Sequence, residues 1–192
     1  MAHDRTVLVT GVASGIGGVA RTVHEAGYDL VLVDLDEAGL ARHAVGTVLT
    51  ENGGGAVVNI ASVPGVLPAV YAASKAGLVG FGTGLAFDFG PLGVAVDTIA
   101  PGIVRTPIRD RIQEEDADRT GLPAEQVFAE HVRPIPLGRA QTAAEIGALT
   151  VFLLGPGARS ISGETVKVTG GMTTVTFDFA KAAAAVRAGV PQ

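Results

Sequence analysis

The chain has 192 residues, a length that suits one domain with a substantial hydrophobic core. Its residues are 47% hydrophobic and 17% charged, which excludes an intrinsically disordered chain. A net charge of −5 without a basic stripe argues against nucleic-acid binding, and a chain without cysteine has no disulfide or thiolate metal site. The N-terminus lacks a signal-peptide layout and no long apolar run predicts a membrane span, so we expect a single cytoplasmic domain over residues 1–192.

Short β-branched runs alternate with helical patterns along the chain. The predicted strands are residues 6–10, 30–34, 56–60, 94–99 and 165–169. The predicted helices are residues 15–26, 37–51, 71–89 and 143–154, two short helices within 107–140 and an Ala-rich tail after residue 179. This alternation predicts an α/β fold of three layers, in which helices cover both faces of a parallel sheet.

A glycine-rich segment, Thr10–Gly17, lies between the first predicted strand and the first predicted helix. Gly11 allows a sharp turn off the strand, Gly15 allows the backbone to approach a pyrophosphate, and Gly17 allows the helix to pack closely on the sheet. The helix N-terminus then presents free N–H groups to the phosphates. We interpret the segment as a dinucleotide-binding loop; the alternative is a tight turn with a purely structural role.

An acidic residue, Asp34, ends the second predicted strand. A carboxylate at this position accepts hydrogen bonds from the adenosine ribose and repels a 2′-phosphate. Ser14, before the second glycine, and Leu35, after the acid, carry no positive charge that would bind such a phosphate. The sequence therefore favours NAD over NADP, with a strand-end cap as the alternative role of Asp34.

Tyr71 and Lys75 open the long predicted helix. A spacing of four places both side chains on one helical face, and a neighbouring ammonium favours the phenolate form of the tyrosine. Such a tyrosine can exchange a proton with an alcohol or a carbonyl oxygen. Ser62 follows the third predicted strand and can hydrogen-bond the same oxygen. The alternative is an exposed helix pair without a catalytic role.

Together these motifs resemble the short-chain dehydrogenase/reductase family, in family order. The resemblance rests on the glycine loop, Asp34, the strand end at Ser62, the Tyr71–Lys75 spacing, the segment Pro101–Thr106 and C-terminal segments such as Ile135–Arg139 and Val168–Met172. It implies a Rossmann-like doubly wound sheet and a nicotinamide cofactor. The residues that it assigns to cofactor binding are Gly11, Ser14, Gly15, Ile16, Gly17, Asp34, Leu35, Tyr71, Lys75, Pro101, Gly102, Val104 and Thr106.

The resemblance also implies an activity, which is reversible hydride transfer between NAD and a secondary alcohol or ketone. Tyr71 would be the acid and base, Lys75 would hold the ribose and assist the phenolate, and Ser62 would polarise the substrate oxygen. Residues 101–106 would line the nicotinamide pocket, with backbone groups and Thr106 meeting the carboxamide. Family members are commonly dimers or tetramers, so a homo-oligomer is expected.

The chain departs from the family between the second strand and the strand before Ser62. Several dozen residues that supply two further strands and a catalytic asparagine have no counterpart here. An unpaired central strand would leave backbone groups unsatisfied, so we predict a closed sheet with fewer strands than the family's usual seven, in the order 30–34, 6–10, 56–60, 94–99, 165–169. The missing segment leaves two alternatives open: an NAD-binding or assembly protein with impaired catalysis, and a fragment completed by a partner subunit.

Two further features of the sequence bear on function. The four histidines, His3, His24, His43 and His131, are scattered without metal-ligand spacing, so we predict no metal site. Residues 107–132 take the place of the family's mobile substrate lid, and their polar character fits a lid or a plain surface excursion.

Overall fold

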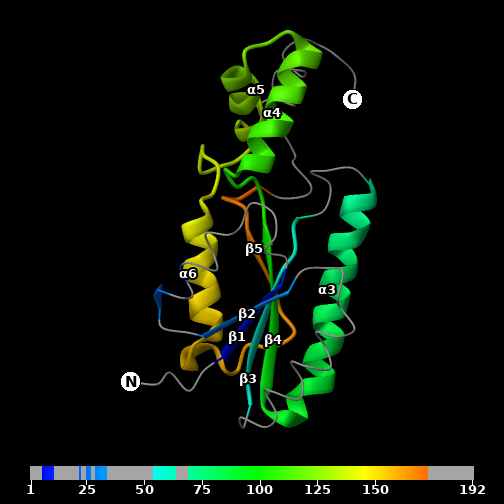
Figure 1. The fold of residues 1–192 in the computed structure, drawn as a ribbon, viewed down its shortest axis with the longest axis vertical. Helices are drawn as coiled ribbons and strands as arrows, with labels where there is room; N and C mark the ends of the chain where they lie inside the picture. Colours follow the sequence, from blue (N-terminus) through cyan, green and yellow to red (C-terminus); the bar gives the residue numbers. More distant parts are fainter. Residues whose placement is uncertain are drawn as a thin grey trace, which may run out of the picture.

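A single sheet of five parallel strands forms the centre of the protein (Figure 1). The computed structural model describes residues 6–10, 22, 25–26, 29–33, 54–63 and 69–172. The strand order is β2-β1-β3-β4-β5. The bounds are β1 Thr6–Thr10, β2 Asp29–Val33, β3 Gly55–Ile60, β4 Val94–Pro101 and β5 Thr165–Val168.

The sheet is continuous between β1 and β3, as the sequence predicts. Val9 pairs with Val58, and Val58 in turn pairs with Asp97 on β4. β5 adds to the far side of β4, with Ile99 paired to Val166. The predicted strand order is therefore confirmed: the missing segment leaves no gap, because β3 supplies the backbone partners that β1 needs.

Helices cover both faces of the sheet. In Figure 1, α3 lies on one face and α6 on the other, while α4 and α5 lie beyond the carboxyl end of β4. The bounds are α3 Ala69–Phe89, α4 Pro107–Thr120, α5 Ala124–Val132 and α6 Ala143–Leu154, with short 3-10 turns η2 Gly90–Leu92 and η3 Pro156–Ala158. The three-layer α/β fold and these predicted helices are confirmed. Strand ends differ from the prediction by one or two residues, since hydrogen bonding to neighbours continues to Pro101 on β4 and stops at Val168 on β5.

The hydrophobic core lies on both sides of β3 and β4. One cluster joins Val58, Ile60 and Ile99 to Ile146 and Leu153 of α6. A second cluster packs the opposite faces of the same strands against α3. β4 is buried for almost its whole length, so it forms the structural centre of the described chain.

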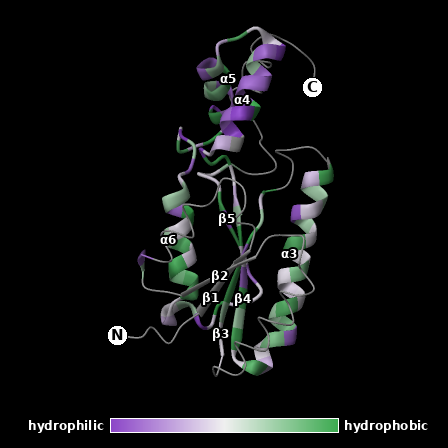
Figure 2. Ribbon diagram, viewed as in Figure 1, coloured by the Kyte–Doolittle hydropathy of each residue, from purple (hydrophilic) through white to green (hydrophobic). Residues whose placement is uncertain are grey.

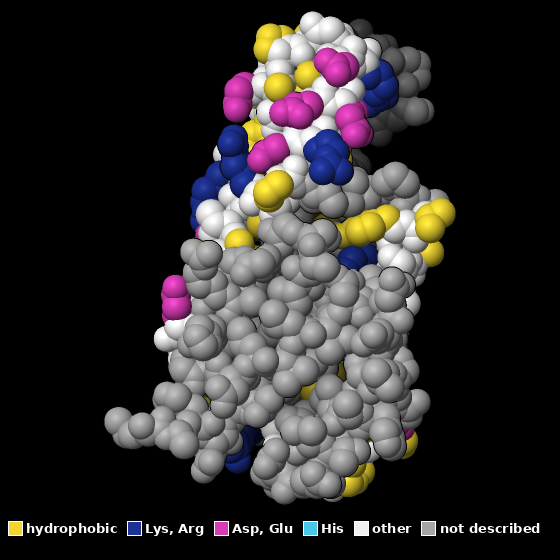
Figure 3. All heavy atoms as spheres, viewed as in Figure 1, with side chains coloured by type: hydrophobic (Ala, Val, Ile, Leu, Met, Phe, Trp, Pro, Cys, Tyr) yellow, Lys and Arg dark blue, Asp and Glu magenta, His cyan; other side chains and the backbone are white. Residues whose placement is uncertain are grey.

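The α4–α5 pair differs in character from the other helices. Figure 2 shows mostly hydrophilic residues on α4 and mostly hydrophobic residues on α6, and Figure 3 shows many acidic and basic side chains on the pair. Phe128 and Val132 of α5 pack with Ile103 and Ile135, which ties the pair to the end of β4. Among the described helices, none is long and apolar enough to cross a membrane.

Local chemistry sets the helix ends near the carboxyl edge of the sheet. The Thr106 hydroxyl accepts a hydrogen bond from the backbone N–H of Arg109 and begins α4. Gly121 ends α4 with φ of 71°, a left-handed conformation that glycine adopts without strain. The glycine loop, the predicted helix at 37–51, most of the helix at 15–26 and the Ala-rich tail lie outside the described residues.

Candidate functional site

The predicted catalytic pair lies in the first two turns of α3. Tyr71 is 39% exposed, and the Nζ atom of Lys75 lies 5.7 Å from the centre of its ring. The four-residue spacing therefore brings the two side chains together, as predicted. The Ser74 hydroxyl, which lies between them in the sequence, donates a 2.8 Å hydrogen bond to the Tyr71 carbonyl oxygen and so binds the helix backbone.

Lys75 also connects α3 to the sheet. Its Nζ donates a 3.3 Å hydrogen bond to the carbonyl oxygen of Ile60, the last residue of β3. Ser62 follows two residues later, half-buried, and its hydroxyl makes a 3.4 Å contact with the Val63 carbonyl oxygen. Tyr71, Lys75 and the chain that carries Ser62 therefore meet at the carboxyl end of β3, the edge where open α/β sheets bind their ligands.

The residues around Ser62 are held in place by β4. The backbone N–H of Ala61 donates to the Ile99 carbonyl oxygen at 2.8 Å, and that of Val63 donates to the Pro101 carbonyl oxygen at 3.0 Å. Pairing between the two strands thus continues past Ile60 on both sides of Ser62. A side chain between two such anchors has a well-defined position, which substrate orientation requires.

The predicted nicotinamide segment continues from β4. The N–H of Gly102 donates to the Val168 carbonyl oxygen at 2.9 Å, and an added Cβ at Gly102 would lie 3.2 Å from the Cα of Thr169. Gly102 is therefore closely packed against the end of β5. Pro101 is buried at the strand end.

Val104 offers backbone groups that the fold does not use. It forms a parallel bridge with Gln141, made by the Ile103 carbonyl oxygen at 2.8 Å and the Arg105 N–H at 3.2 Å. The Val104 N–H and C=O point away from that bridge and have no partner within the described part of the chain, although the residue is only 8% exposed. A buried residue with an unused donor and acceptor fits a planar amide such as the nicotinamide carboxamide.

Thr106 combines a structural role with an available hydrogen. It is buried, and its oxygen accepts the Arg109 N–H at 3.4 Å as the cap of α4. A hydroxyl that accepts in this way keeps its own hydrogen for donation. The donor set of Lys75, Val104 and Thr106 therefore fits a nicotinamide and its ribose.

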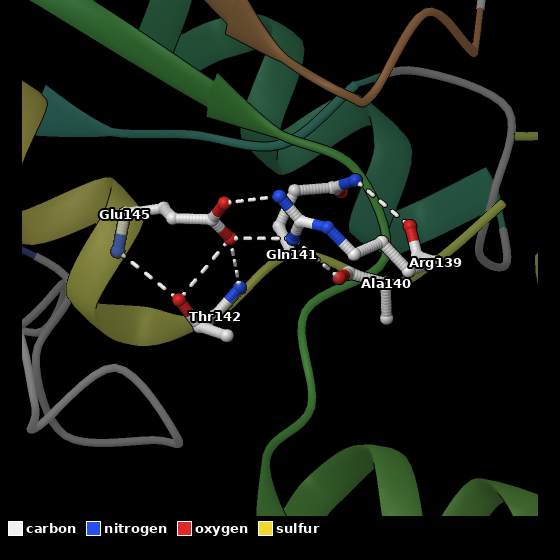
Figure 4. Close-up of polar contacts among 5 residues, drawn as sticks. All are labelled: Arg139, Ala140, Gln141, Thr142 and Glu145. Carbon is white, nitrogen blue, oxygen red and sulfur yellow. Dashed lines mark hydrogen bonds and ion pairs between the residues drawn. The ribbon is translucent and has the colours of Figure 1, made fainter. Parts of the chain in front are cut away.

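Gln141 is a site neighbour that the sequence pattern does not reveal. It is buried beside Gly102 and Val104, and its Oε1 atom has no hydrogen-bond partner in the described residues. Figure 4 shows it between Arg139, which pairs with Glu145, and Thr142, which caps α6. The sequence around Gln141 does not mark it as part of the site. Its place there follows only from the return of the chain beside residues 103–105.

A polar cluster connects α4 to α5 where a substrate lid was predicted. A guanidinium nitrogen of the buried Arg109 contacts Nδ1 of His131, and Nε2 of His131 lies 3.6 Å from Asp116. A guanidinium can only donate, so Nδ1 accepts and His131 is neutral with its hydrogen on Nε2. Burial, followed by the Arg109 charge, holds the pKa of His131 below its ordinary value, while Asp116 opposes the shift.

The other half of the predicted cofactor site lies outside the described residues. This half consists of Gly11, Ser14, Gly15, Ile16, Gly17, Asp34 and Leu35. Their strands, β1 and β2, end at the same edge of the sheet as β3 and β4 because all the strands are parallel.

Comparisons with known proteins agree with this arrangement. The profile of the family described as Enoyl-(Acyl carrier protein) reductase matches residues 39–173. The chain is 37% identical over 155 residues to the short-chain reductase protein NovJ of Streptomyces niveus, covering 78% of this chain and 57% of that protein. It is 35% identical over 149 residues to the 3-oxoacyl-acyl-carrier-protein reductase FabG of Pseudomonas aeruginosa, covering 76% and 56%.

Solved structures show the same fold. A variant of actinorhodin polyketide ketoreductase, crystallised with NADPH, matches with a TM-score of 0.76 at 22% identity, over 91% of this chain and 100% of that one. Levodione reductase matches with a TM-score of 0.73 at 21% identity, over 89% and 98%. The sequence alignments cover between 49% and 66% of the first curated relatives' own length.

The five-stranded parallel sheet, with Lys75 of α3 bonded to the end of β3, defines a Rossmann-like α/β protein. The chain belongs to the short-chain dehydrogenase/reductase family.

Proposed function

We propose that the chain is an oxidoreductase that interconverts a secondary alcohol and a ketone. The observation that carries this proposal is the contact of Lys75 with both the Tyr71 ring and the Ile60 carbonyl oxygen, next to Ser62. This contact supports the assignment of an acid–base group, its cation and a hydroxyl donor to one edge of the sheet. We further propose that residues 1–192 form one domain, which acts in the cytoplasm as a homo-oligomer on a small-molecule substrate.

The cofactor, when bound, would accept the hydride at C4 of its nicotinamide ring during oxidation and would return it during reduction. In the oxidative direction, the Tyr71 phenolate oxygen takes the hydroxyl proton of the alcohol while the carbon loses its hydride and becomes a ketone. Reduction is the reverse, and Tyr71 then returns the proton to the carbonyl oxygen. The Lys75 ammonium stabilises the phenolate, and Ser62 donates a hydrogen bond to the substrate oxygen.

The decisive experiment compares two tyrosine variants. Tyr71→Phe should abolish NADH-linked turnover on a panel of alcohols and ketones, yet retain cofactor binding in a calorimetric titration. Tyr28→Phe is the matched control, since Tyr28 is the other of the two tyrosines and should leave turnover unchanged. Equal turnover of the Tyr71→Phe variant and the parent protein would contradict the proposal.

We propose NAD rather than NADP as the cofactor. Support comes from Asp34, whose carboxylate would repel a 2′-phosphate, and from the uncharged Ser14 and Leu35. The actinorhodin ketoreductase structure contains NADPH, so the preference has to be tested directly. NADH should bind more tightly than NADPH in a calorimetric titration. Asp34→Ser should reduce the difference between the two dissociation constants. Tighter binding of NADPH by the parent protein would overturn the assignment.

A second candidate function is cofactor binding without catalysis. The pairing of β1 directly with β3 favours it, because the family's catalytic asparagine belongs to a segment that this chain lacks. Cofactor binding without turnover by a folded protein, over the whole substrate panel, would select this second function.

A further inference from the structure

A cavity lies between α5 and the segment that leads into α6. Its volume is about 580 Å³, within the size range of small-molecule sites. The residues that line it include Arg105, Phe128, Arg133, Arg139 and Gln141. None of the predicted catalytic residues lines it.

The lining of the cavity carries more basic than acidic side chains. Three arginines and a single carboxylate, that of Glu130, line it among the residues that the structure describes. Figure 3 shows basic side chains gathered where the α4–α5 pair meets the rest of the molecule. Phe128, Val132 and Ala140 supply an apolar surface beside these charges.

Arg105 is the group best prepared to bind an anion. Its guanidinium carbon lies 4.1 Å from the centre of the Phe128 ring, so stacking fixes the plane of the side chain. Its ion-pair partner, Glu125, lies 3.7 Å away with a side chain that is 79% exposed. Within the described part of the chain this guanidinium donates no hydrogen bond, and its forked donors therefore match a carboxylate or a phosphate.

The other two arginines differ in how many of their nitrogens already donate hydrogen bonds. Both terminal nitrogens of Arg139 donate hydrogen bonds to the Glu145 carboxylate, at 2.6 and 3.0 Å, so this side chain shapes the rim of the cavity (Figure 4). Arg133 uses only its Nε, which donates to Glu130 at 3.0 Å. Its two terminal nitrogens have no partner in the described residues and give the cavity a second guanidinium for an anion.

We propose that this cavity binds a small organic anion, an apolar body that carries a carboxylate or a phosphate. Arg105 and Arg133 hold the anionic group, while Phe128 and Val132 contact the apolar body. The cavity adjoins the predicted nicotinamide segment through Arg105 and Gln141, but Phe128, Val132 and Arg133 lie on or next to α5, and Ser62, Tyr71 and Lys75 do not line it.

The test is a calorimetric titration of the full chain at low ionic strength with benzoate and with phenyl phosphate. Both probes carry an apolar ring and an oxyanion, so the tighter one identifies the anionic group of the natural ligand. Benzyl alcohol, which lacks charge, and inorganic phosphate, which lacks the ring, should bind at least about tenfold more weakly, since each loses one set of contacts.

Variants locate the binding to the cavity. Arg105→Gln and Arg133→Gln should each lower the affinity for the tighter-binding probe about tenfold or more, because a charge-assisted hydrogen bond is lost. Arg105→Lys keeps the charge without the forked donors and should show a smaller loss. Arg159→Gln, an exposed arginine outside the cavity, is the matched control and should bind as the parent does.

Two results would overturn the proposal. One is the absence of binding by both ring-bearing probes at millimolar concentrations. The other is binding that survives Arg105→Gln and Arg133→Gln but is lost in Lys75→Met, which would place the probe in the oxidoreductase site. Retention of binding in Lys75→Met, together with its loss in the two arginine variants, supports the cavity whatever the fate of the catalytic proposal.

Discussion

The Lys75 ammonium donates a 3.3 Å hydrogen bond to the Ile60 carbonyl oxygen at the end of β3. The same nitrogen lies 5.7 Å from the centre of the Tyr71 ring. One side chain therefore sets the distance between the start of α3 and the strand end that carries Ser62. This contact makes Lys75 both an electrostatic partner of Tyr71 and a link between helix and sheet.

Replacing Lys75 with methionine should lower kcat/KM by at least about 100-fold, because the cation beside the Tyr71 ring and its bond to the Ile60 carbonyl oxygen are lost while the apolar stem remains. Steady-state kinetics measures the effect, and circular dichroism shows whether the fold is intact. Ser74→Ala is the control, since its hydroxyl binds only the helix backbone at Tyr71. Unchanged kinetics in the methionine variant would remove Lys75 from the mechanism.

The fold follows from the sequence to a large extent. Alternating strand and helix patterns predict the elements, and the need to pair every central strand predicts that β3 lies beside β1. The capping chemistry at Thr106 and the stop at Gly121 set the bounds of α4. These features are local or follow from a general rule about backbone hydrogen bonds.

The site is only partly predictable in the same way. The Tyr71–Lys75 contact follows from helical spacing, whereas the Lys75–Ile60 bond depends on how α3 packs on the sheet. Gln141 reaches the site because the chain returns beside Val104. The contact of Arg109 with His131 joins two helices at a distance in sequence that no periodic pattern encodes.

Acidification should loosen the contact between α4 and α5. The pKa of His131 is lower in the folded protein than its ordinary value of 6.5, because the ring is partly buried and, secondly, because Nδ1 faces the Arg109 guanidinium. The folded state therefore favours the neutral ring, and stability falls as pH drops from 6.5 through the folded pKa. The Asp116 carboxylate opposes the lowering of the His131 pKa. Arg119 binds Asp116 at 2.6 Å, so Asp116 and Arg119 are the other charged groups of the cluster.

Thermal unfolding between pH 7.5 and pH 5 measures the effect. The parent protein should lose stability over this range, and His131→Asn, which keeps a hydrogen-bonding side chain without a titration, should lose less. A parallel pH dependence in both proteins would show that other groups control the acid response.

Asp97→Asn should stabilise the protein at neutral pH. Asp97 is 2% exposed in the middle of β4, and burial raises the pKa of its carboxyl above the ordinary 3.8, although the Glu164 N–H bond at 3.0 Å opposes the shift. The unfolded chain releases this proton at lower pH, so stability falls as pH rises from 3.8 through the folded pKa. Asparagine keeps the acceptor oxygen and carries no charge, and the gain should be about 1 kcal/mol.

Urea unfolding at pH 7 and at pH 3 tests this expectation. The difference between Asp97→Asn and the parent should be present at pH 7 and much smaller at pH 3, where the parent carboxyl is protonated. Asp118→Asn makes the same change on the exposed face of α4 and should leave stability within about 0.5 kcal/mol. A loss of stability in Asp97→Asn at pH 7 would show that the carboxylate is required in its charged form.

The start of α6 depends on a reciprocal cap between Thr142 and Glu145. The Thr142 hydroxyl accepts the Glu145 N–H at 3.2 Å, and the Glu145 carboxylate accepts the Thr142 N–H at 2.8 Å. Thr142→Ala should cost about 1 kcal/mol in urea unfolding, whereas Thr142→Ser should be nearly neutral. Equal stability of the alanine and serine variants would show that the hydroxyl does not contribute.

The same cap has a pH signature. The hydrogen bonds from Arg139, and then those from Thr142, lower the pKa of Glu145 to about 2. Its contribution is therefore complete above the ordinary value of 4.5 and is lost as pH falls from 4.5 through about 2. In Glu145→Gln, the free energy of unfolding should depend less on pH below 4.5 than in the parent protein. The same pH dependence in both proteins would show that Glu145 does not contribute to it.

Gly82 is a point of close approach between α3 and the sheet. A Cβ built there would lie 2.6 Å from Oγ1 of Thr98 and 2.8 Å from Nδ2 of Asn59, both of which are buried. Gly82→Ala should therefore force α3 away from β3 and β4 and cost about 1–3 kcal/mol. Gly80→Ala, at a helical position where an added Cβ would meet nothing within 4 Å, should instead stabilise the protein by up to about 1 kcal/mol, because alanine is the better helix former.

Urea unfolding measures both variants. Changes of opposite sign in the free energy of unfolding would show that packing on the sheet, rather than helix propensity, requires glycine at residue 82. If both variants gain stability, α3 lies further from the sheet than these contacts imply. Because the same helix carries Tyr71 and Lys75, Gly82→Ala should also lower turnover, and Gly80→Ala should not.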